Sequence, residues 1–251
     1  MMHVNDLTIP ANTISNIPEE EYQITATLVS TFDAISRLVY QGLYIIDYNK
    51  HNFLHVSDNP LLLCGHTAQE VKEMGYMFYV NHVSEKDHAM LAEINAAGFN
   101  FFEKIPDKEK INYALSFDIH LVFGRRKTLV NHKFAPILLN NEGKIWLAAC
   151  LVSLSSHTTQ GNVVLRKTGY PFFWEYSLKN HQWEEKKEII LTEKEKDTLL
   201  LSAQGYSMNE IAEKLCVVLD TVRFYKKSIF EKLQVKNIVE AVSFASNYRL
   251  L

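Results

Sequence analysis

The chain has 251 residues, of which 47% are hydrophobic and 22% charged, and its formal net charge is −3. This composition predicts one or two domains with a packed core and excludes an intrinsically disordered chain. No apolar run approaches the ~18 residues of a membrane span and no secretory signal is visible, so we expect a cytoplasmic protein without a membrane partner. Cys64, Cys150 and Cys216 are scattered, which argues against a disulfide framework or a zinc site.

Basic residues gather in the C-terminal part of the chain. Residues 191–251 hold nine Lys and Arg against eight Asp and Glu, whereas the remainder holds 17 against 21. Within the C-terminal part, the basic residues concentrate between positions 223 and 236. Because attraction to phosphate is screened within roughly 8–10 Å, a local patch matters more than the net charge. The distribution therefore leaves nucleic-acid binding open despite an acidic chain.

The N-terminal part begins with helical periodicity and then changes to strands. We expect a tail over 1–19 and a helix within 18–40, followed by strands over 42–50 and 51–59. Short helical pieces come next, with Thr67 as N-cap and Glu70 completing a capping box. A longer helix should start at Ser84, its expected cap, and stop at Pro106.

Three longer strands complete this part of the chain. They are expected over 111–123, 128–140 and 144–154, with turns at "GRRKT" and "NNEGK". The order of helix, two strands, short helices, one longer helix and three strands predicts an α+β domain over 20–155. Its core should be a five-stranded antiparallel sheet with helices gathered on one face.

This order resembles a PAS domain. The residues that carry the resemblance are "GLYIID", "FLHVSDNPLLLCGHTAQEV" and "YVNHVSEKDHAML". The resemblance implies a domain that senses a small-molecule ligand, binds a protein partner or sets the geometry of a homodimer. The aromatic segments "GYMFYV" and "FNFF" would either line a ligand cavity or form plain core. A generic α+β domain is the alternative interpretation.

No cofactor, metal site or catalytic set is expected. His66, His82 and His88 are candidate haem ligands, but no ligand-spaced pair stands out among them. The surroundings of Cys64, "LLLCGH", do not match a flavin photosensor. The sequence shows no Ser/His/Asp set, paired carboxylates or phosphate loop, so we do not expect an enzyme.

Residues 156–190 are expected to form an ordered connector. "FFWEYSLKNHQWEE" predicts a β-hairpin that turns near Lys179 and Asn180, with Trp174 and Trp183 facing each other across the pair. A separate domain over 191–251 should follow this connector.

Three N-terminal capping patterns define helices in the C-terminal part. Thr192 is followed by Glu195, Ser207 by Glu210, and Asn237 by Glu240. Gly205 stands where a glycine ends the first helix. A second helix, "MNEIAEKL", and a third over 219–233 are separated only by "CVV", which predicts a helix-turn-helix.

The third helix carries two different faces. Val222, Ile229, Phe230 and Leu233 should be core, whereas Asp220, Arg223, Phe224, Lys227 and Glu231 share the opposite face. Such a helix fits the major groove: Arg223 can contact guanine, Lys227 bases or phosphate, and Phe224 a thymine methyl group. For Phe224 the alternative is packing against the N-terminal domain, and we expect Glu231 to be merely solvated.

Residues 191–245 resemble the LuxR-type, or GerE-type, helix-turn-helix domain over essentially its full length. Leu191-Thr192, Glu195, Ala203-Gln204-Gly205, Glu210-Ile211-Ala212, Thr221-Val222 and Lys232-Leu233 are among the matching positions. The resemblance implies a four-helix domain that binds double-stranded DNA, and a homodimer through its fourth helix. Its base-reading positions fall on Arg223, Phe224 and Lys227, and its phosphate-contacting positions on Thr221, Tyr225, Lys226 and Lys232.

Several residues depart from the family pattern. Val218 stands where a capping Ser is usual, Cys216 replaces a usual Gly or aromatic residue, and Gln234 replaces a common Gly. The third helix should therefore start without a side-chain cap. The missing cap and the acidic chain leave a second interpretation open, an interaction and dimerisation module whose helix-turn-helix no longer binds DNA.

Overall fold

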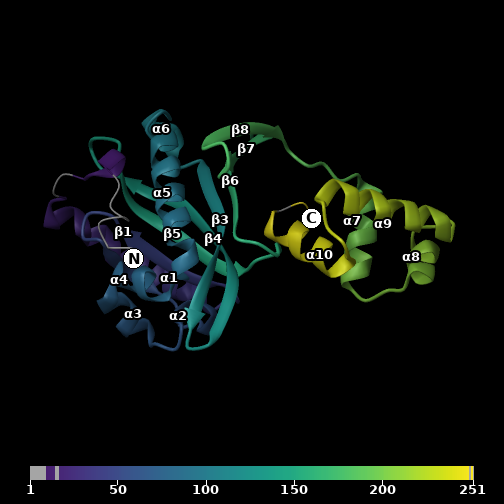
Figure 1. Cartoon of the computed structure of the whole chain (residues 1–251), viewed down its shortest axis with the longest axis horizontal. Coiled ribbons are helices and arrows are strands. Elements are labelled where there is room, and N and C mark those ends of the chain that lie inside the picture. The colour runs from purple at the N-terminus through teal and green to yellow at the C-terminus, as the bar shows by residue number, and fades with distance from the viewer. Residues whose placement is uncertain (1–9, 15–16, 249, 251) are drawn as a thin grey trace. The chain divides into compact units, whose positions relative to one another are not determined.

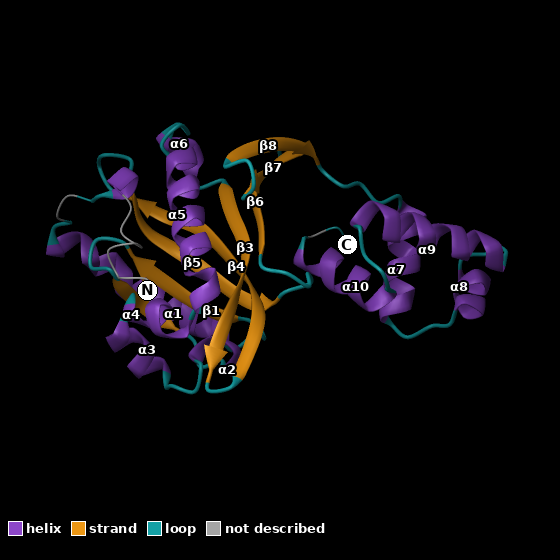
Figure 2. Cartoon of the chain, in the orientation of Figure 1, coloured by secondary structure: helices purple, strands orange, loops and turns teal. Residues whose placement is uncertain are grey.

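The computed structural model describes residues 10–14, 17–248 and 250, so part of the tail expected over 1–19 lies outside the described residues. The chain divides into two compact units, Met1–Lys186 and Lys187–Leu251 (Figure 1). The first unit combines a sheet with helices and the second consists of helices, as Figure 2 shows. The predicted α+β fold class is thus confirmed. None of the described helices is long and apolar enough to cross a membrane.

One sheet of eight strands organises the first unit. Its order is β2-β1-β5-β4-β3-β6-β7-β8, and the registered pairs are antiparallel. The strands are β1 (Gly42–Asp47), β2 (Asn52–Val56), β3 (Tyr113–Phe123), β4 (Arg126–Leu139), β5 (Ile145–Leu154), β6 (Gly161–Lys167), β7 (Phe172–Ser177) and β8 (Gln182–Lys187). The first five strands follow the expected chain order.

The expected sheet of five strands was too small. The segment assigned to a connector supplies β6, which pairs with β3 from Tyr113↔Lys167 onward, and β7 then pairs with β6. Alternating apolar residues of β6, Val163 and Leu165, are almost fully buried. The connector prediction missed this pairing because a strand's partner lies far away in sequence, here about 50 residues from β3.

Helices lie between and before the strands of this unit. They are α1 (Gln23–Ser36), α2 (Pro60–Leu63), α3 (Ala68–Met74), α4 (Met77–His82), α5 (His88–Phe102) and α6 (Asp107–Lys110), with 3-10 turns at Pro10–Asn12, Glu19–Tyr22 and Glu85–Asp87. The capping box of Thr67 and Glu70 is present at the start of α3. Ser84, by contrast, makes no side-chain capping bond and precedes a 3-10 turn, so α5 starts three residues later than expected.

The helices cover both faces of the sheet rather than one. Tyr44 and Ile46 of β1 belong to the main core, which includes Ile94 and Phe99 of α5. Ile45, which points to the opposite face because strand side chains alternate, packs with Trp146, Leu147, and Leu28 and Phe32 of α1. The expectation that helices gather on one face was therefore wrong for α1.

Trp183 makes a ring contact across the hairpin with Tyr176, at a centroid distance of 5.1 Å, where contact with Trp174 was expected. Both indole rings make edge contacts with Phe101 of α5, at centroid distances of 5.3 and 5.2 Å. The Trp183 indole N–H also donates to the carbonyl of Ala97. The hairpin thus packs against α5 through its tryptophans, which joins the end of the sheet to the same helix that covers its centre.

Four helices lie in the described part of the second unit, in agreement with the expected number. They are α7 (Glu193–Ala203), α8 (Met208–Lys214), α9 (Leu219–Leu233) and α10 (Ile238–Asn247). Capping boxes are present at Thr192 and Ser207, and the Asn237 side chain accepts from the backbone of Glu240. Leu199, Ile229 and Ala241 are buried where α7, α9 and α10 meet. Local capping signals therefore predicted where three of these helices begin.

We expect Val218→Ser to stabilise the helical unit by about 1 kcal/mol. Val218 is the N-cap of α9, has extended backbone and makes no side-chain capping bond. It is 70% exposed, so losing its methyl groups costs little, whereas a serine hydroxyl can accept from a free N–H of the first turn. Urea unfolding followed by far-UV circular dichroism measures the change, because the three tryptophans all belong to the first unit.

Val218→Ala is the matched control, since it removes the same branched side chain without adding an acceptor. Equal stability of the Ser and Ala variants would contradict the capping explanation.

Candidate nucleic-acid interface and interior cavity

The break between α8 and α9 is a tight turn held by backbone geometry. Cys216 adopts a left-handed conformation with φ of 52°, and the Val217 N–H donates to the Ala212 carbonyl at 2.9 Å. Ala212, Ile211 and Val222 are buried together beneath the turn. The small side chain of Ala212 lets the two helices cross closely. Cys216 and Gln234, the two departures at glycine-favouring positions, both have positive φ, so the usual backbone is kept despite their side chains.

The face of α9 opposite this core is open to solvent. The side chains of Arg223 and Lys227 are 58% and 78% exposed, and Phe224 is 66% exposed between them. Thr221, Tyr225 and Lys226 lie half-buried along the edges of the same helix, and Lys232 lies in its last turn. An exposed phenylalanine between two basic residues is unfavourable in water unless a partner covers it.

The basic side chains of this face are paired within the helix. Arg223 binds Asp220 at 2.7 Å, and Lys227 lies 3.8 Å from Glu231. Exposed ion pairs of this kind contribute only about 0–1 kcal/mol. Phosphates or base edges can therefore replace them at small cost, and both cations remain available to a nucleic acid.

Lys232 differs from the other basic residues because it binds a buried carboxylate. Its Nζ donates to Glu195 at 2.7 Å and to the Ile190 carbonyl at 3.2 Å. Glu195 also accepts from Ser228 at 2.6 Å and from the backbone of Thr192 at 2.7 Å. This carboxylate therefore caps α7 and ties it to two successive turns of α9. Lys232 has a structural role in addition to the phosphate contact expected of it.

The pKa of Glu195 reflects these contacts. Burial alone would raise the pKa of this carboxyl group, but the hydrogen bonds from Lys232, Ser228 and Thr192 outweigh burial and lower it to about 2. The group is thus ionised at every pH above the acid range. The position of α9 against α7 depends on that charge.

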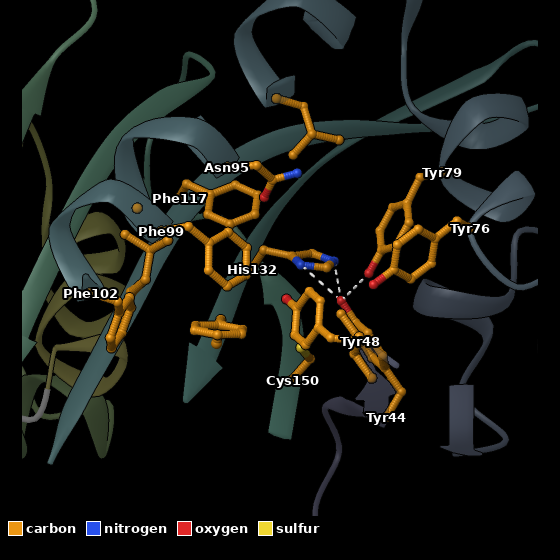
Figure 3. Close-up of a pocket in the computed structure, with 15 residues that line it drawn as sticks. Tyr44, Tyr48, Tyr76, Tyr79, Asn95, Phe99, Phe102, Phe117, His132 and Cys150 are labelled. Carbon is orange, nitrogen blue, oxygen red and sulfur yellow. Dashed lines mark hydrogen bonds between the residues drawn. The ribbon is translucent and has the colours of Figure 1, made fainter. Parts of the chain in front are cut away.

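The first unit contains an interior cavity between α5, α4 and the inner face of the sheet (Figure 3). Its free volume is about 50 Å³, several times the roughly 10–15 Å³ that one water molecule needs. The walls are mostly aromatic; they include Tyr44, Tyr48, Tyr76, Tyr79, Phe99, Phe102, Phe117 and Phe134, together with Asn95, His132 and Cys150. No acidic side chain, lysine or arginine is among the residues that line it.

The ionisable groups of the cavity are neutral at pH 7. Burial raises the pKa of Tyr44, Tyr48, Tyr76 and Tyr79. Burial likewise raises the pKa of Cys150 to about 12 and lowers the pKa of His132 to about 4. The cavity therefore offers hydrogen bonds without charge.

Only some of these polar groups have partners. The Tyr44 hydroxyl forms hydrogen bonds with the Tyr79 hydroxyl and, at 3.1 Å, with His132 Nδ1, and Figure 3 shows these groups converging at one end of the cavity. The Tyr76 hydroxyl is buried and has no hydrogen-bond partner among the described residues. Since an unpaired buried hydroxyl costs roughly 1–3 kcal/mol, Tyr76 is a point where a bound molecule would gain a hydrogen bond.

The sequence indicated only part of this cavity. "GYMFYV" supplies Tyr76 and Tyr79, and "FNFF" supplies Phe99 and Phe102, as the cavity interpretation expected. Tyr44, His132 and Cys150 were missed, although each occupies an inward position of an alternating strand. Period-two patterning marks such residues as inward-facing, but it does not distinguish a cavity wall from a filled core.

Comparisons with known proteins find similarity in the second unit. Residues 189–245 match the model of the family described as bacterial regulatory proteins, luxR family. The transcriptional regulatory protein DesR of Bacillus subtilis (strain 168) is 47% identical over 53 residues, which is 21% of this chain and 27% of DesR. The response regulator protein VraR of Staphylococcus aureus (strain Mu3 / ATCC 700698) is 39% identical over 62 residues, or 25% of this chain and 30% of VraR.

The chain thus spans less than a third of the length of these curated relatives. Among solved structures, one match is a Vibrio cholerae VqmA dimer, whose description refers to LuxR-type receptors. The match covers 87% of this chain and 87% of the VqmA chain, with 13% sequence identity and a TM-score of 0.35. A second match is to a structure described as VqmA bound to DPO. It covers 87% of this chain and 86% of that VqmA chain, with 14% sequence identity and a TM-score of 0.34.

We expect Glu195→Gln to lower the free energy of unfolding by about 2 kcal/mol at pH 7, because it weakens charge-assisted hydrogen bonds to α9. The wild-type advantage should persist above pH 4.5, the ordinary pKa of this group, and disappear as the pH falls toward about 2. The direction follows because a depressed native pKa means that the unfolded chain takes up the proton first. Urea unfolding by far-UV circular dichroism at pH 7, 4 and 3 tests it.

Glu193→Gln is the matched control for this experiment. Its carboxylate lies in the same helical turn, is 84% exposed and binds only Lys196 among the described residues. A pH-independent difference between wild type and Glu195→Gln would contradict the role assigned to the Glu195 charge.

We expect Tyr76→Phe and Tyr79→Phe to have opposite effects on the first unit. Tyr76→Phe removes an unpaired buried hydroxyl and should stabilise the ligand-free chain by up to about 1 kcal/mol. Tyr79→Phe removes a hydrogen bond to Tyr44 and should destabilise it by about 1 kcal/mol. Urea unfolding followed by tryptophan fluorescence reports on this unit. If Tyr76→Phe were as destabilising as Tyr79→Phe, an ordered water would be its partner instead.

Proposed function

Because residues 189–245 form a LuxR-type helix-turn-helix domain, we propose that the chain is a cytoplasmic, sequence-specific transcriptional regulator. The observation that carries this proposal is the open face of α9, where Arg223, Phe224 and Lys227 are exposed beside one another. The family itself consists of regulatory proteins rather than enzymes.

In this proposal, three side chains of α9 contact the bases directly. Arg223 can donate two hydrogen bonds to one guanine, and Lys227, one turn later, reaches a base or a phosphate. Phe224 contacts a thymine methyl group, which removes its exposed ring from water. Their spacing of one, three and four residues keeps all three on the groove side of the helix.

Phosphate contacts fix the helix in the groove and supply most of the affinity. We assign these contacts to Thr221, Tyr225, Lys226 and Lys232, which flank the reading face of α9. Lys232 would act while bound to Glu195, so its contribution should be smaller than that of Lys226. Affinity that rests on such contacts falls steeply as salt rises.

A homodimer would present two recognition helices to half-sites about one helical turn apart. We assign the dimer contact to α10, where Val239 is 74% exposed, and to the PAS-like first unit. An exposed valine on a helix outside the DNA-reading face fits a surface that a second copy covers.

The first unit would adjust this activity through its cavity. The neutral aromatic walls and the unpaired Tyr76 hydroxyl suit a small, uncharged molecule that offers a hydrogen bond. The PAS-like unit would otherwise act by setting dimer geometry or by binding a partner protein. Copurification of a ligand, or a thermal shift that Tyr76→Phe weakens, would favour the ligand-binding role.

We expect Arg223→Ala to weaken binding to the specific site by ~1–3 kcal/mol and to relax the preference at one base pair. The site would first be obtained by selecting bound fragments from random DNA with the full chain. Fluorescence anisotropy over a range of salt concentrations then measures affinity. Lys179→Ala, which removes one exposed charge from the β7–β8 turn of the other unit, is the control and should leave binding unchanged.

A two-fold symmetric motif that Arg223→Ala no longer enriches would support the regulator. No enriched motif at low salt, with either the full chain or residues 188–251, would favour the interaction module that has lost DNA binding. Unchanged affinity and preference in Arg223→Ala would instead mean that α9 does not read the bases.

A further inference from the structure

Two histidines that are distant in sequence meet on the first unit, outside the cavity. His66 lies between α2 and α3, and His82 is the last residue of α4. Their Nε2 atoms are 3.0 Å apart, and the ring centroids are 4.9 Å apart with the planes at 69°. The two rings therefore point their outer nitrogens at nearly the same place.

The other nitrogen of each ring faces an acceptor. His82 Nδ1 lies 3.0 Å from the carbonyl of Val122, so this nitrogen carries the proton and leaves the Nε2 lone pair of the neutral ring directed at His66. His66 Nδ1 faces the Glu70 carboxylate at 4.0 Å. Histidines that bind metals characteristically direct their second nitrogen to a backbone carbonyl or a carboxylate in this way.

Two Nε2 lone pairs cannot remain directed at each other across 3.0 Å. Either neutral His66 carries its proton on Nε2 and donates a hydrogen bond to His82, or a metal ion takes the place of that proton and binds both nitrogens. With metal–nitrogen bonds of about 2.0–2.1 Å, two imidazole nitrogens are separated by about 2.9 Å at a right angle and about 3.3 Å at the tetrahedral angle. The observed separation lies between these values, so the two nitrogens already have the spacing that one bridging metal ion requires.

We propose that His66 and His82 form a binding site for a divalent late transition-metal ion, such as Zn²⁺ or Cu²⁺. Imidazole nitrogen suits these ions. No group of three or more His, Cys, Asp or Glu side chains suited to a metal occurs among the described residues, so water completes the coordination. The site is accessible, because the His66 side chain is 35% exposed.

The surroundings of His82 give the site rigidity. Its ring packs on Phe78, with centroids 4.9 Å apart, and Phe78 is almost fully buried. The bond to Val122 fixes the same ring to the end of β3. A bound metal would therefore tie the α2–α3 loop to α4 and β3. Tyr79, which lines the cavity, lies one turn before His82 on α4, so metal binding would also restrain one cavity wall.

The test is a Zn²⁺ titration of the full chain, purified without a histidine tag and treated with a chelator, by isothermal calorimetry. We expect one site per chain, weakened at least tenfold in His66→Gln and in His82→Gln. His181→Gln is the control; this histidine is 67% exposed and binds Glu93, and its loss should leave the affinity unchanged. Cu²⁺ electron paramagnetic resonance should show two bound nitrogens in wild type and at most one in His66→Gln.

Absence of Zn²⁺ binding, or equal binding by wild type and His66→Gln, would overturn the proposal and leave a proton between the rings. Thermal unfolding of the metal-free variants shows whether each one folds. If His82→Gln did not fold, His66→Gln would decide the matter, because the more exposed ring can be replaced with little loss of packing.

Discussion

The orientation of the proposed recognition helix depends on one buried carboxylate. Glu195 accepts hydrogen bonds from Thr192 at the start of α7 and from Ser228 and Lys232 on α9. The apolar face of α9, which includes Ile229, packs against Leu199 of α7 and leaves Arg223, Phe224 and Lys227 exposed. Charge-assisted hydrogen bonds are directional, so Glu195 adds a fixed point to this apolar packing.

A different constraint shapes the first unit, where strand alternation assigns side chains to two cores. Tyr44 and Ile46 enter the larger core beneath α5, and Ile45 enters the smaller one beneath α1. Large aromatic residues at the inward positions do not fill the larger core completely, so a neutral cavity remains between them. Tyr44, Tyr79 and His132 form hydrogen bonds with one another there, whereas the Tyr76 hydroxyl has no hydrogen-bond partner among the residues that the structure describes. The cavity is thus a place where packing and hydrogen bonding are both incomplete.

How far the sequence predicted the structure depended on the distance over which each signal acts. The capping residues Thr67, Thr192 and Ser207 were identified correctly because their partners lie three positions ahead. The segment expected to be a connector, residues 156–190, was not assigned to the sheet because β6 pairs with β3, which lies far away along the chain. Ser84 was misassigned as the cap of α5 because a distant contact and a local turn both act there. Its backbone N–H donates to the His120 carbonyl on β3, and a 3-10 turn lies between Ser84 and α5.

By itself, the sequence determined the helix-turn-helix and the exposed face of its second helix, because capping and helical periodicity are set by neighbours within one or two turns. It also determined the chain order of the α+β unit. Tertiary structure alone decided the eight-stranded sheet, the cavity lined by Tyr44 and His132, and the meeting of His66 with His82. Each of these joins residues whose separation in sequence carries no periodic signal, so only the packing of distant segments brings them together.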